Sequence, residues 1–206
     1  SNVTGEGTSF ASPAVTGAAA LVQQKYPWMN GDLIRQSILS TATDVGAAGV
    51  DAVYGWGLLN ASKAANGPAL FDKRLALCDY VNVSFDNYTS SFSNDISGDA
   101  GLTKSGSGTL ILSGNNTYTG KNIVNGGILK VNGQVVSQID IQSNGTLAVD
   151  GGIIQNNVLN HGGTMTNEGN GTTIHGIYMA SSEAVTEHAM GAEFKVHGRV
   201  ILNNSK

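Results

Sequence analysis

One short glycine-punctuated phrase recurs four times along the second half of the chain. It stands at residues 108–114 (GTLILSG), 126–133 (GGILKVNG), 144–152 (NGTLAVDGG) and 162–169 (GGTMTNEG). Each copy places apolar residues between Gly and Asn turns, which is typical of a short β-strand. One copy is too small to bury its own apolar face, so neighbouring copies must stack. The pattern predicts a parallel β-solenoid (β-helix) rather than a sandwich of hairpins, because the same phrase repeats.

Further strand-like segments flank these copies, among them VNVSF at residues 81–85 and GRVILNN at residues 198–204. We expect the solenoid to occupy residues 98–206, with inward Leu, Ile and Val ladders, and residues 67–97 to link it to what precedes. Tyr118 and Tyr178 are expected to stack inside it. Residues 181–191 (SSEAVTEHAMG) are expected to form a short solvated helix.

The first part of the chain, residues 1–66, has helical rather than strand periodicity. Val15 and Val22 stand at helical spacing in AVTGAAALVQQKYP. We expect Pro13 in the first turn of this helix, and Pro27 to end it. Since the segment is apolar on nearly every side, it is predicted to be buried inside a larger body.

A second helix is predicted in NGDLIRQSILSTATD, with Asn30 or Asp32 as its N-cap and an inward face made of Leu33, Ile34, Ile38 and Leu39. Asn60 is expected to cap a third, short helix. This part of the chain contains no convincing run of strands, and about 66 residues are marginal as a domain. We therefore expect the sheet that these helices cover to lie upstream.

The charge balance points away from nucleic acid and anionic lipid as partners, since the net charge is −4 and the pI about 5.4. Cys78 is the only cysteine, so no internal disulfide is possible. We expect it to be a small, half-buried residue near a strand. The histidine spacing offers no clustered metal site, and no cofactor is evident.

The stretch GTSFASP, residues 7–13, contains the one candidate catalytic residue, Ser9. From the residues alone two interpretations stay open. Thr8 or Ser9 could cap the helix, as serines at helix starts commonly do. Alternatively Ser9 is a nucleophile whose reaction intermediate is stabilised by the backbone N–H groups and the positive end of the helix.

The full string from Gly7 to Leu21 resembles the nucleophile motif of the subtilisin-like serine proteases. The later residues 54–57 (YGWG) and 59–61 (LNA) are similar to the closing segment of the same family. The resemblance covers roughly residues 5–65. It implies that residues 1–66 are the C-terminal part of a subtilisin-like α/β peptidase domain, that Ser9 is the catalytic nucleophile, and that the Ser9 N–H is one oxyanion donor.

In that family the triad Asp and His and the oxyanion Asn all precede the serine, whereas only eight residues precede Ser9 here. A serine without a base is a poor nucleophile. The expectation is therefore an endopeptidase as the parent and an inert fragment in this chain. The chain's own histidines all follow Ser9, and we treat them as surface or solenoid residues: His161, His175, His188 and His197. An α/β-hydrolase order, with Ser first, is disfavoured by Ala11 at the elbow's fifth position.

Residues 101–133 resemble the passenger-associated repeat of bacterial autotransporters. The resemblance implies export to the Gram-negative cell surface or secretion, and protein or peptide substrates. It also implies a C-terminal outer-membrane barrel as a partner in the parent, with none of it expected within this chain. The alternative function is a non-enzymatic surface adhesin whose solenoid carries the relic of a protease domain.

Overall fold

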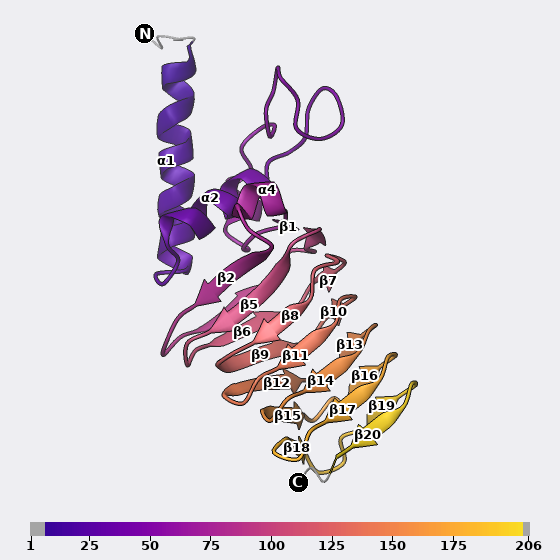
Figure 1. Ribbon diagram of the computed structural model, residues 1–206. Coiled ribbons are helices and arrows are strands. Elements are labelled where there is room, and N and C mark those ends of the chain that lie inside the picture. Colours follow the sequence, from indigo (N-terminus) through magenta and orange to yellow (C-terminus); the bar gives the residue numbers. More distant parts are fainter. Residues whose placement is uncertain (1–6, 204–206) are drawn as a thin grey trace. The chain divides into compact units, whose positions relative to one another are not determined.

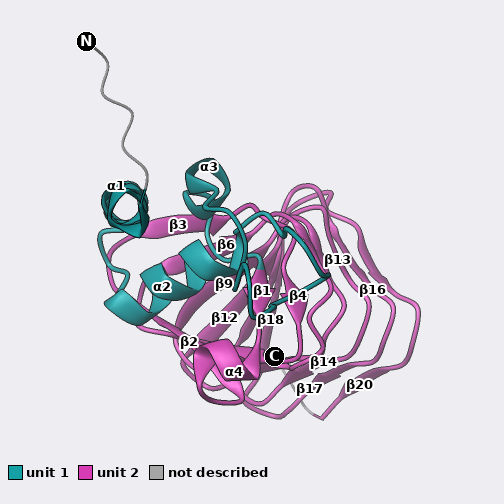
Figure 2. Ribbon diagram, turned by 90° about the horizontal axis from the view of Figure 1, so that it is seen from above, with its two compact units in different colours: residues 1–69 teal, residues 70–206 magenta. Residues whose placement is uncertain are grey.

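The computed structural model describes residues 7–203 (Figure 1). The chain divides into two compact units, residues 1–69 and residues 70–206 (Figure 2). The first unit is helical and the second is built from β-strands. Within the described residues, no helix is long and apolar enough to cross a membrane.

The helical unit contains three helices that contact one another: α1 (Thr8–Lys25), α2 (Gly31–Ser40) and α3 (Ala61–Ala64). Two expected caps are confirmed. The Asn30 side chain accepts a hydrogen bond from the Leu33 N–H at 2.9 Å, and the Asn60 side chain accepts one from the Lys63 N–H at 2.9 Å. These bonds satisfy backbone donors that the first turn of a helix leaves free.

Helix α1 begins earlier than expected. Gly7 is its N-cap and Thr8 its first residue, so the prediction that Pro13 lies in the first turn is wrong. Proline has no N–H and cannot bond the carbonyl four residues earlier, which belongs to Ser9. Because this stretch is exposed, the Ser9 carbonyl can be hydrated, and the helix continues through Pro13. The helix ends at Lys25, two residues before Pro27, as expected.

The second unit opens with a short capping region. Strand β1 (Leu70–Phe71) pairs in parallel with β4 (Ser97–Gly98), and α4 (Lys73–Ala76) lies between β1 and the first long strand in sequence. Asp72 caps α4 by accepting hydrogen bonds from the Arg74 and Leu75 N–H groups. The side-chain hydrogen bond from Arg74 holds the pKa of Asp72 below its ordinary value.

The rest of the unit is a parallel β-solenoid of three sheets, to which successive turns of the chain contribute one strand each (Figure 1). One sheet contains β2 (Tyr80–Ser84), β5 (Gly101–Ser105), β8 (Asn122–Val124), β11 (Ile139–Ile141), β14 (Val158–Asn160), β17 (Tyr178–Ala180) and β20 (Val200–Leu202). The second contains β3 (Thr89–Phe92), β6 (Thr109–Leu112), β9 (Gly127–Val131), β12 (Gly145–Val149), β15 (Thr164–Asn167) and β18 (Val185–His188). The third contains β7 (Asn115–Asn116), β10 (Gln134–Val135), β13 (Gly152–Ile154), β16 (Thr172–Ile174) and β19 (Phe194–Val196).

The interior consists of in-register ladders, one residue from each coil. Leu110 pairs with Leu129, Leu129 with Leu147, and Leu147 with Met165, and all four are fully buried. Since the strands of all three sheets pair in parallel, the solenoid is confirmed and the sandwich of hairpins is wrong for this chain. Each coil buries its apolar residues against the coils before and after it.

The sheets include residues 80–84 and 89–92, which the sequence pattern assigns to the linker. Val81 and Val83 of β2 are buried, and they pair with Leu102 and Lys104 of β5. Alternation of buried and exposed residues is the same in this stretch as in the later coils. The described solenoid ladders therefore start at Tyr80 rather than at residue 98.

Of two further expectations, the one for residues 181–191 is wrong and the one for the two tyrosines is confirmed. Residues 185–188 form strand β18, paired in parallel with β15, so the short helix predicted at residues 181–191 is wrong. The ladder fixes an extended backbone there, as in the Val185 N–H bond to the Gly163 carbonyl. Tyr118 and Tyr178 are buried as expected, each with its ring against a phenylalanine: Tyr118 on Phe71 and Tyr178 on Phe194.

Candidate active site

Ser9 is the second residue of α1, and its side chain is exposed. The N-cap position belongs to Gly7, and no side chain there makes a capping hydrogen bond. Neither Thr8 nor Ser9 is therefore the helix cap. Among residues 7–203, the Ser9 hydroxyl has no hydrogen-bond partner. The geometry leaves this hydroxyl accessible on the first turn of a helix.

The first turn of α1 has the electrostatics of an anion site. It contains no acidic residue, and it begins an 18-residue helix whose aligned peptide dipoles place partial positive charge at this end. The backbone N–H groups of the first turn lack intrahelical acceptors, apart from the Phe10 N–H, which bonds the Gly7 carbonyl at 3.1 Å. A negative charge that forms on an atom bound to Ser9 would be stabilised here.

The helical unit supplies no imidazole to act as a base for Ser9, because residues 1–69 contain no histidine. All of the chain's histidines belong to the second unit, where they are exposed: His161, His175, His188 and His197. The carboxylates of residues 7–69 are engaged elsewhere. Asp32 accepts from Arg35 and Gln36, and Asp51 accepts from the Val53 and Tyr54 N–H groups, which lower its pKa.

The helical unit leaves much of its apolar surface open. Phe10 is 63% exposed and Leu21 50% exposed, so the expected burial of α1 is not achieved within this chain, where Ala18 and Val22 are its buried residues. An apolar hollow of about 340 Å³ is lined by residues of α1, of α2 and the turn after it, and of the segment from 56 to 59: Ala11, Ala14, Val15, Ile38, Leu39, Ala42, Trp56, Gly57, Leu58 and Leu59. Contiguous open apolar surface of this kind marks a site of contact with other protein.

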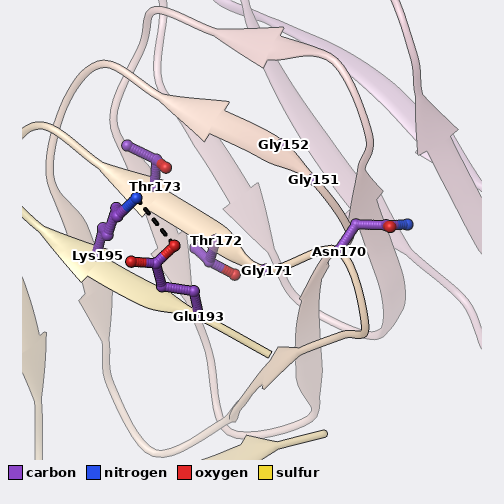
Figure 3. A pocket seen from close by; sticks show the side chains of 8 residues that line it. All are labelled: Gly151, Gly152, Asn170, Gly171, Thr172, Thr173, Glu193 and Lys195. Carbon is purple, nitrogen blue, oxygen red and sulfur yellow. Dashed lines mark ion pairs between the residues drawn. The ribbon is translucent and has the colours of Figure 1, made fainter. Parts of the chain in front are cut away.

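A polar hollow of about 190 Å³ lies in the solenoid, and Figure 3 shows it closely. Its lining includes glycines at three positions and an ion pair between Lys195 and Glu193 at 2.9 Å: Gly151, Gly152, Asn170, Gly171, Thr172, Thr173, Glu193 and Lys195. It brings together no nucleophile and base. Nowhere in residues 7–203 do three His, Cys, Asp or Glu side chains gather as metal ligands.

Two side chains lie differently from what the sequence suggested. Cys78 is exposed rather than half-buried, and its thiol donates to the Tyr80 carbonyl. Lys104 is fully buried inside the solenoid, a position that was not anticipated from the sequence. The signal was present in the alternation of residues 102–104, where Leu102 points inward, Thr103 outward and Lys104 inward again.

Comparison with known proteins assigns families to both parts of the chain. Residues 2–57 match the model of the subtilase family, and residues 102–131 match the passenger-associated-transport-repeat. The first match falls within the expected peptidase part at residues 1–66, and the second within the expected repeat at residues 101–133.

Three relatives illustrate the similarity. The neisserial autotransporter lipoprotein NalP of Neisseria meningitidis serogroup B is 42% identical over 202 residues, which cover 95% of this chain and 18% of that protein. An extracellular serine protease of Serratia marcescens is 39% identical, over 70% of this chain and 17% of the relative. Subtilisin DY of Bacillus licheniformis is 48% identical over 59 residues, which are 29% of this chain and 20% of that enzyme.

This chain thus spans less than a fifth of the length of NalP and of the Serratia extracellular serine protease. It covers the region in which a subtilase segment passes into a passenger repeat, and its fold agrees, with helices first and a parallel β-solenoid after them. In this chain a segment that matches the subtilase family is followed by a passenger-associated-transport-repeat, which makes the chain similar to a fragment of a subtilisin-like autotransporter.

Proposed function

We propose that this chain carries the nucleophile of a subtilisin-like serine endopeptidase, and that Ser9 is that nucleophile. The observation that supports this most directly is the accessible Ser9 hydroxyl on the first turn of α1, within a segment that matches the subtilase family. The substrates are proteins or peptides, as expected for this family. No metal or cofactor takes part in the reaction as we propose it.

In the proposed reaction, Ser9 Oγ attacks the carbonyl carbon of the scissile peptide bond, and its proton passes to a histidine. The carbonyl oxygen becomes an oxyanion, which the Ser9 N–H at the helix N-terminus helps to stabilise. The tetrahedral intermediate collapses when the histidine returns the proton to the leaving amine, which leaves an acyl-enzyme ester on Ser9. Water then hydrolyses this ester by the same route. Subtilisins are well-characterised triad enzymes, so this assignment of roles follows the family.

The proton acceptor is proposed to lie outside this chain. Residues 1–69 contain no histidine, and the aspartates of residues 7–69 are engaged with neighbouring groups. We infer that the triad Asp and His belong to a preceding segment and that this chain alone is inert. The open apolar hollow beside α1 supports the idea that further protein packs against the helical unit.

The layout that we propose is a peptidase part at residues 1–66, a connection that begins at residue 67, and a passenger solenoid that includes the repeat at residues 101–133. The autotransporter and extracellular relatives place the chain at the Gram-negative cell surface or among secreted proteins. A C-terminal outer-membrane barrel in the parent is the proposed partner of the passenger. The passenger's proposed role is to hold the peptidase part away from the membrane.

A fluorophosphonate probe, read by intact mass, tests the assignment because it reacts with activated serines. Three proteins are compared: this chain, its extension upstream to a complete peptidase domain, and the extension with Ser9→Ala. We expect labelling of the extended protein alone, with complete loss in Ser9→Ala. Ser12→Ala in the extended protein is the matched control, since Ser12 lies in the same helix, and it should label normally.

Other outcomes have definite meanings. Labelling of the short chain at Ser9 would mean that it contains a base, which contradicts the proposed split triad. A folded extended protein that does not label would favour the alternative, a surface adhesin with a protease relic.

A further inference from the structure

Lys104 lies in an inward-facing ladder of the solenoid, and its neighbours in that ladder are apolar. In register, it stands between Val83 of β2 and Val124 of β8, both buried. The lysine side chain is itself fully buried, with a relative exposure of 0%. A buried ammonium without hydrogen-bond partners would be strongly destabilising, so its contacts must explain its presence.

The ammonium has one acceptor for each of its three N–H donors. Lys104 Nζ donates to the carbonyl oxygens of Ser105 at 2.7 Å, Gly106 at 3.1 Å and Gly126 at 3.3 Å. Ser105 and Gly106 belong to the end of β5 and the turn after it, whereas Gly126 belongs to the turn after β8 in the next coil. The side chain therefore connects two successive turns of one corner.

A third turn, from the preceding coil, completes the enclosure. The ring of Phe85, which follows β2, lies 4.8 Å from Lys104 Nζ, at a distance where an aromatic face attracts a cation. Asp86, the next residue, is the charged group whose field acts on Lys104, and it accepts hydrogen bonds from the Ser107 N–H and hydroxyl. Three successive coils thus meet at one ammonium.

Glycines make this close stacking sterically feasible. A Cβ at Gly106, where φ is +73°, would lie 2.4 Å from the Phe85 carbonyl oxygen. A Cβ at Gly127, where φ is +62°, would lie 2.3 Å from the Gly106 carbonyl oxygen. Any side chain at either position would push the turns apart and lengthen the contacts to Lys104.

We propose that Lys104 is a cationic clamp that holds three successive turns of this corner, at residues 85–86, 105–108 and 125–127, in one fixed stack. The repeat at residues 102–131 supplies the lysine and its three carbonyl acceptors, and the preceding coil supplies the aromatic ring. The clamp thereby couples the first three coils of the solenoid mechanically.

Hydrogen exchange of the full chain, resolved by peptide mass, tests the clamp with Lys104→Met, which keeps an apolar stem and removes the donors. The amides of Gly108, Asn125 and Gly126, which bond across this corner, should exchange about tenfold faster or more, because the three hydrogen bonds from Lys104 Nζ no longer oppose local opening. The amides of Gly133 and Gln134, at another corner, should keep their rates. Unchanged exchange at the first corner in a folded variant would overturn the proposal.

Lys121→Met is the matched control, because Lys121 immediately precedes β8 in the neighbouring coil but has an exposed side chain that pairs with Asp140. It should leave the corner amides unchanged, and an equal acceleration there would contradict a role specific to Lys104. A second measurement needs no variant, in case Lys104→Met does not fold. Acetylation of the unmodified chain by a water-soluble succinimidyl ester at pH 7 should modify Lys104 at least about tenfold more slowly than Lys121. Equal rates would overturn the clamp.

Discussion

Two leucines summarise how differently the two units of this chain are built. Leu21 of α1 is 50% exposed, whereas Leu129 of β9 is fully buried between Leu110 and Leu147 of the neighbouring coils. Both stand in segments that the sequence marks as strongly apolar. The difference lies in where each residue finds its partners.

The solenoid supplies its own partners because the same short phrase returns in every coil. A residue at an inward position meets its counterpart one coil earlier and one coil later, so each ladder inside the array is closed. The helices have no such repetition, and several of their apolar residues stay exposed within residues 7–69. A repeat can therefore be cut at many points and still bury its interior, while a layered α/β domain cannot.

The largest effect should come from truncating Leu129, with Leu21 as the contrasting site. Leu129→Ala is expected to lower the free energy of unfolding by about 2–5 kcal/mol, because it removes buried contacts and leaves a cavity. Leu21→Ala should change it by less than about 0.5 kcal/mol in this chain, since the side chain is half exposed and Ala favours helix. In urea unfolding, tryptophan fluorescence reports the helical unit alone, because both tryptophans, Trp28 and Trp56, lie in it.

Equal losses at the two leucines would break the comparison, since they would show that α1 is as well packed as the solenoid interior. The comparison becomes sharper if Leu21→Ala turns destabilising once the chain is extended upstream. That result would mean that added protein covers Leu21.

A second prediction concerns the charge inside the solenoid. Burial lowers the pKa of Lys104 to about 8, while Asp86 acts in the opposite sense. In the unfolded chain Lys104 keeps its ordinary pKa near 10.5. Between about pH 8 and pH 10.5 the unfolded chain therefore binds more protons than the folded chain, so the free energy of unfolding rises with pH. The unfolding free energy of the unmodified chain, relative to Lys104→Met, should therefore rise by up to about 3 kcal/mol between about pH 8 and pH 10.5.

Lys121→Met again serves as control, measured by the same urea titrations at each pH. The hydrogen bond to Asp140 raises the pKa of Lys121, so the contribution of this pair persists through about pH 10. Its difference from the unmodified chain should stay flat up to about pH 10. A flat difference for Lys104→Met as well would mean that Lys104 is solvated, and the contrast between a closed solenoid and an open helical unit would weaken.

Smaller losses should come from single side chains that accept a backbone N–H, one in each unit. Asn30→Ala removes the cap of α2, and Asp95→Ala removes a carboxylate that accepts from the Asn115 N–H at 2.7 Å in the next coil. Each is expected to lower the stability of its own unit by about 1 kcal/mol. Tryptophan fluorescence reports the first and far-ultraviolet circular dichroism the second. Effects that spread from either unit to the other would indicate that the units unfold together.

Much of the fold could be predicted from local patterns. The Gly/Asn-punctuated phrase predicted stacked parallel coils, and Asn30 and Asn60 were identified as caps because a side-chain acceptor is favoured at those positions. The predicted start of α1 was wrong because Pro13 suggested a first turn, whereas the helix begins just after Gly7. The helix expected at residues 181–191 was wrong because pairing with β15 overrides local preference.

The candidate site was predictable only as far as Ser9, which the resemblance assigns and whose role stays a prediction. Sequence alone could not tell whether Thr8 or Ser9 caps the helix, because that depends on the backbone at Gly7. The sequence alone also could not show where the chain's four histidines lie in the fold. Lys104 was missed because an inward lysine among valines looks like an exposed residue until the register is known.

The sequence by itself determined the class of each unit, because helical and strand periodicities and glycine turns are local properties of the chain. Only the tertiary structure decided which side chains are enclosed, because burial depends on residues brought together from different coils. Leu129 and Lys104 lie in the same closed interior, one held by apolar contacts and the other by three carbonyl oxygens. Leu21 stays half exposed because the described residues around it do not enclose its side chain.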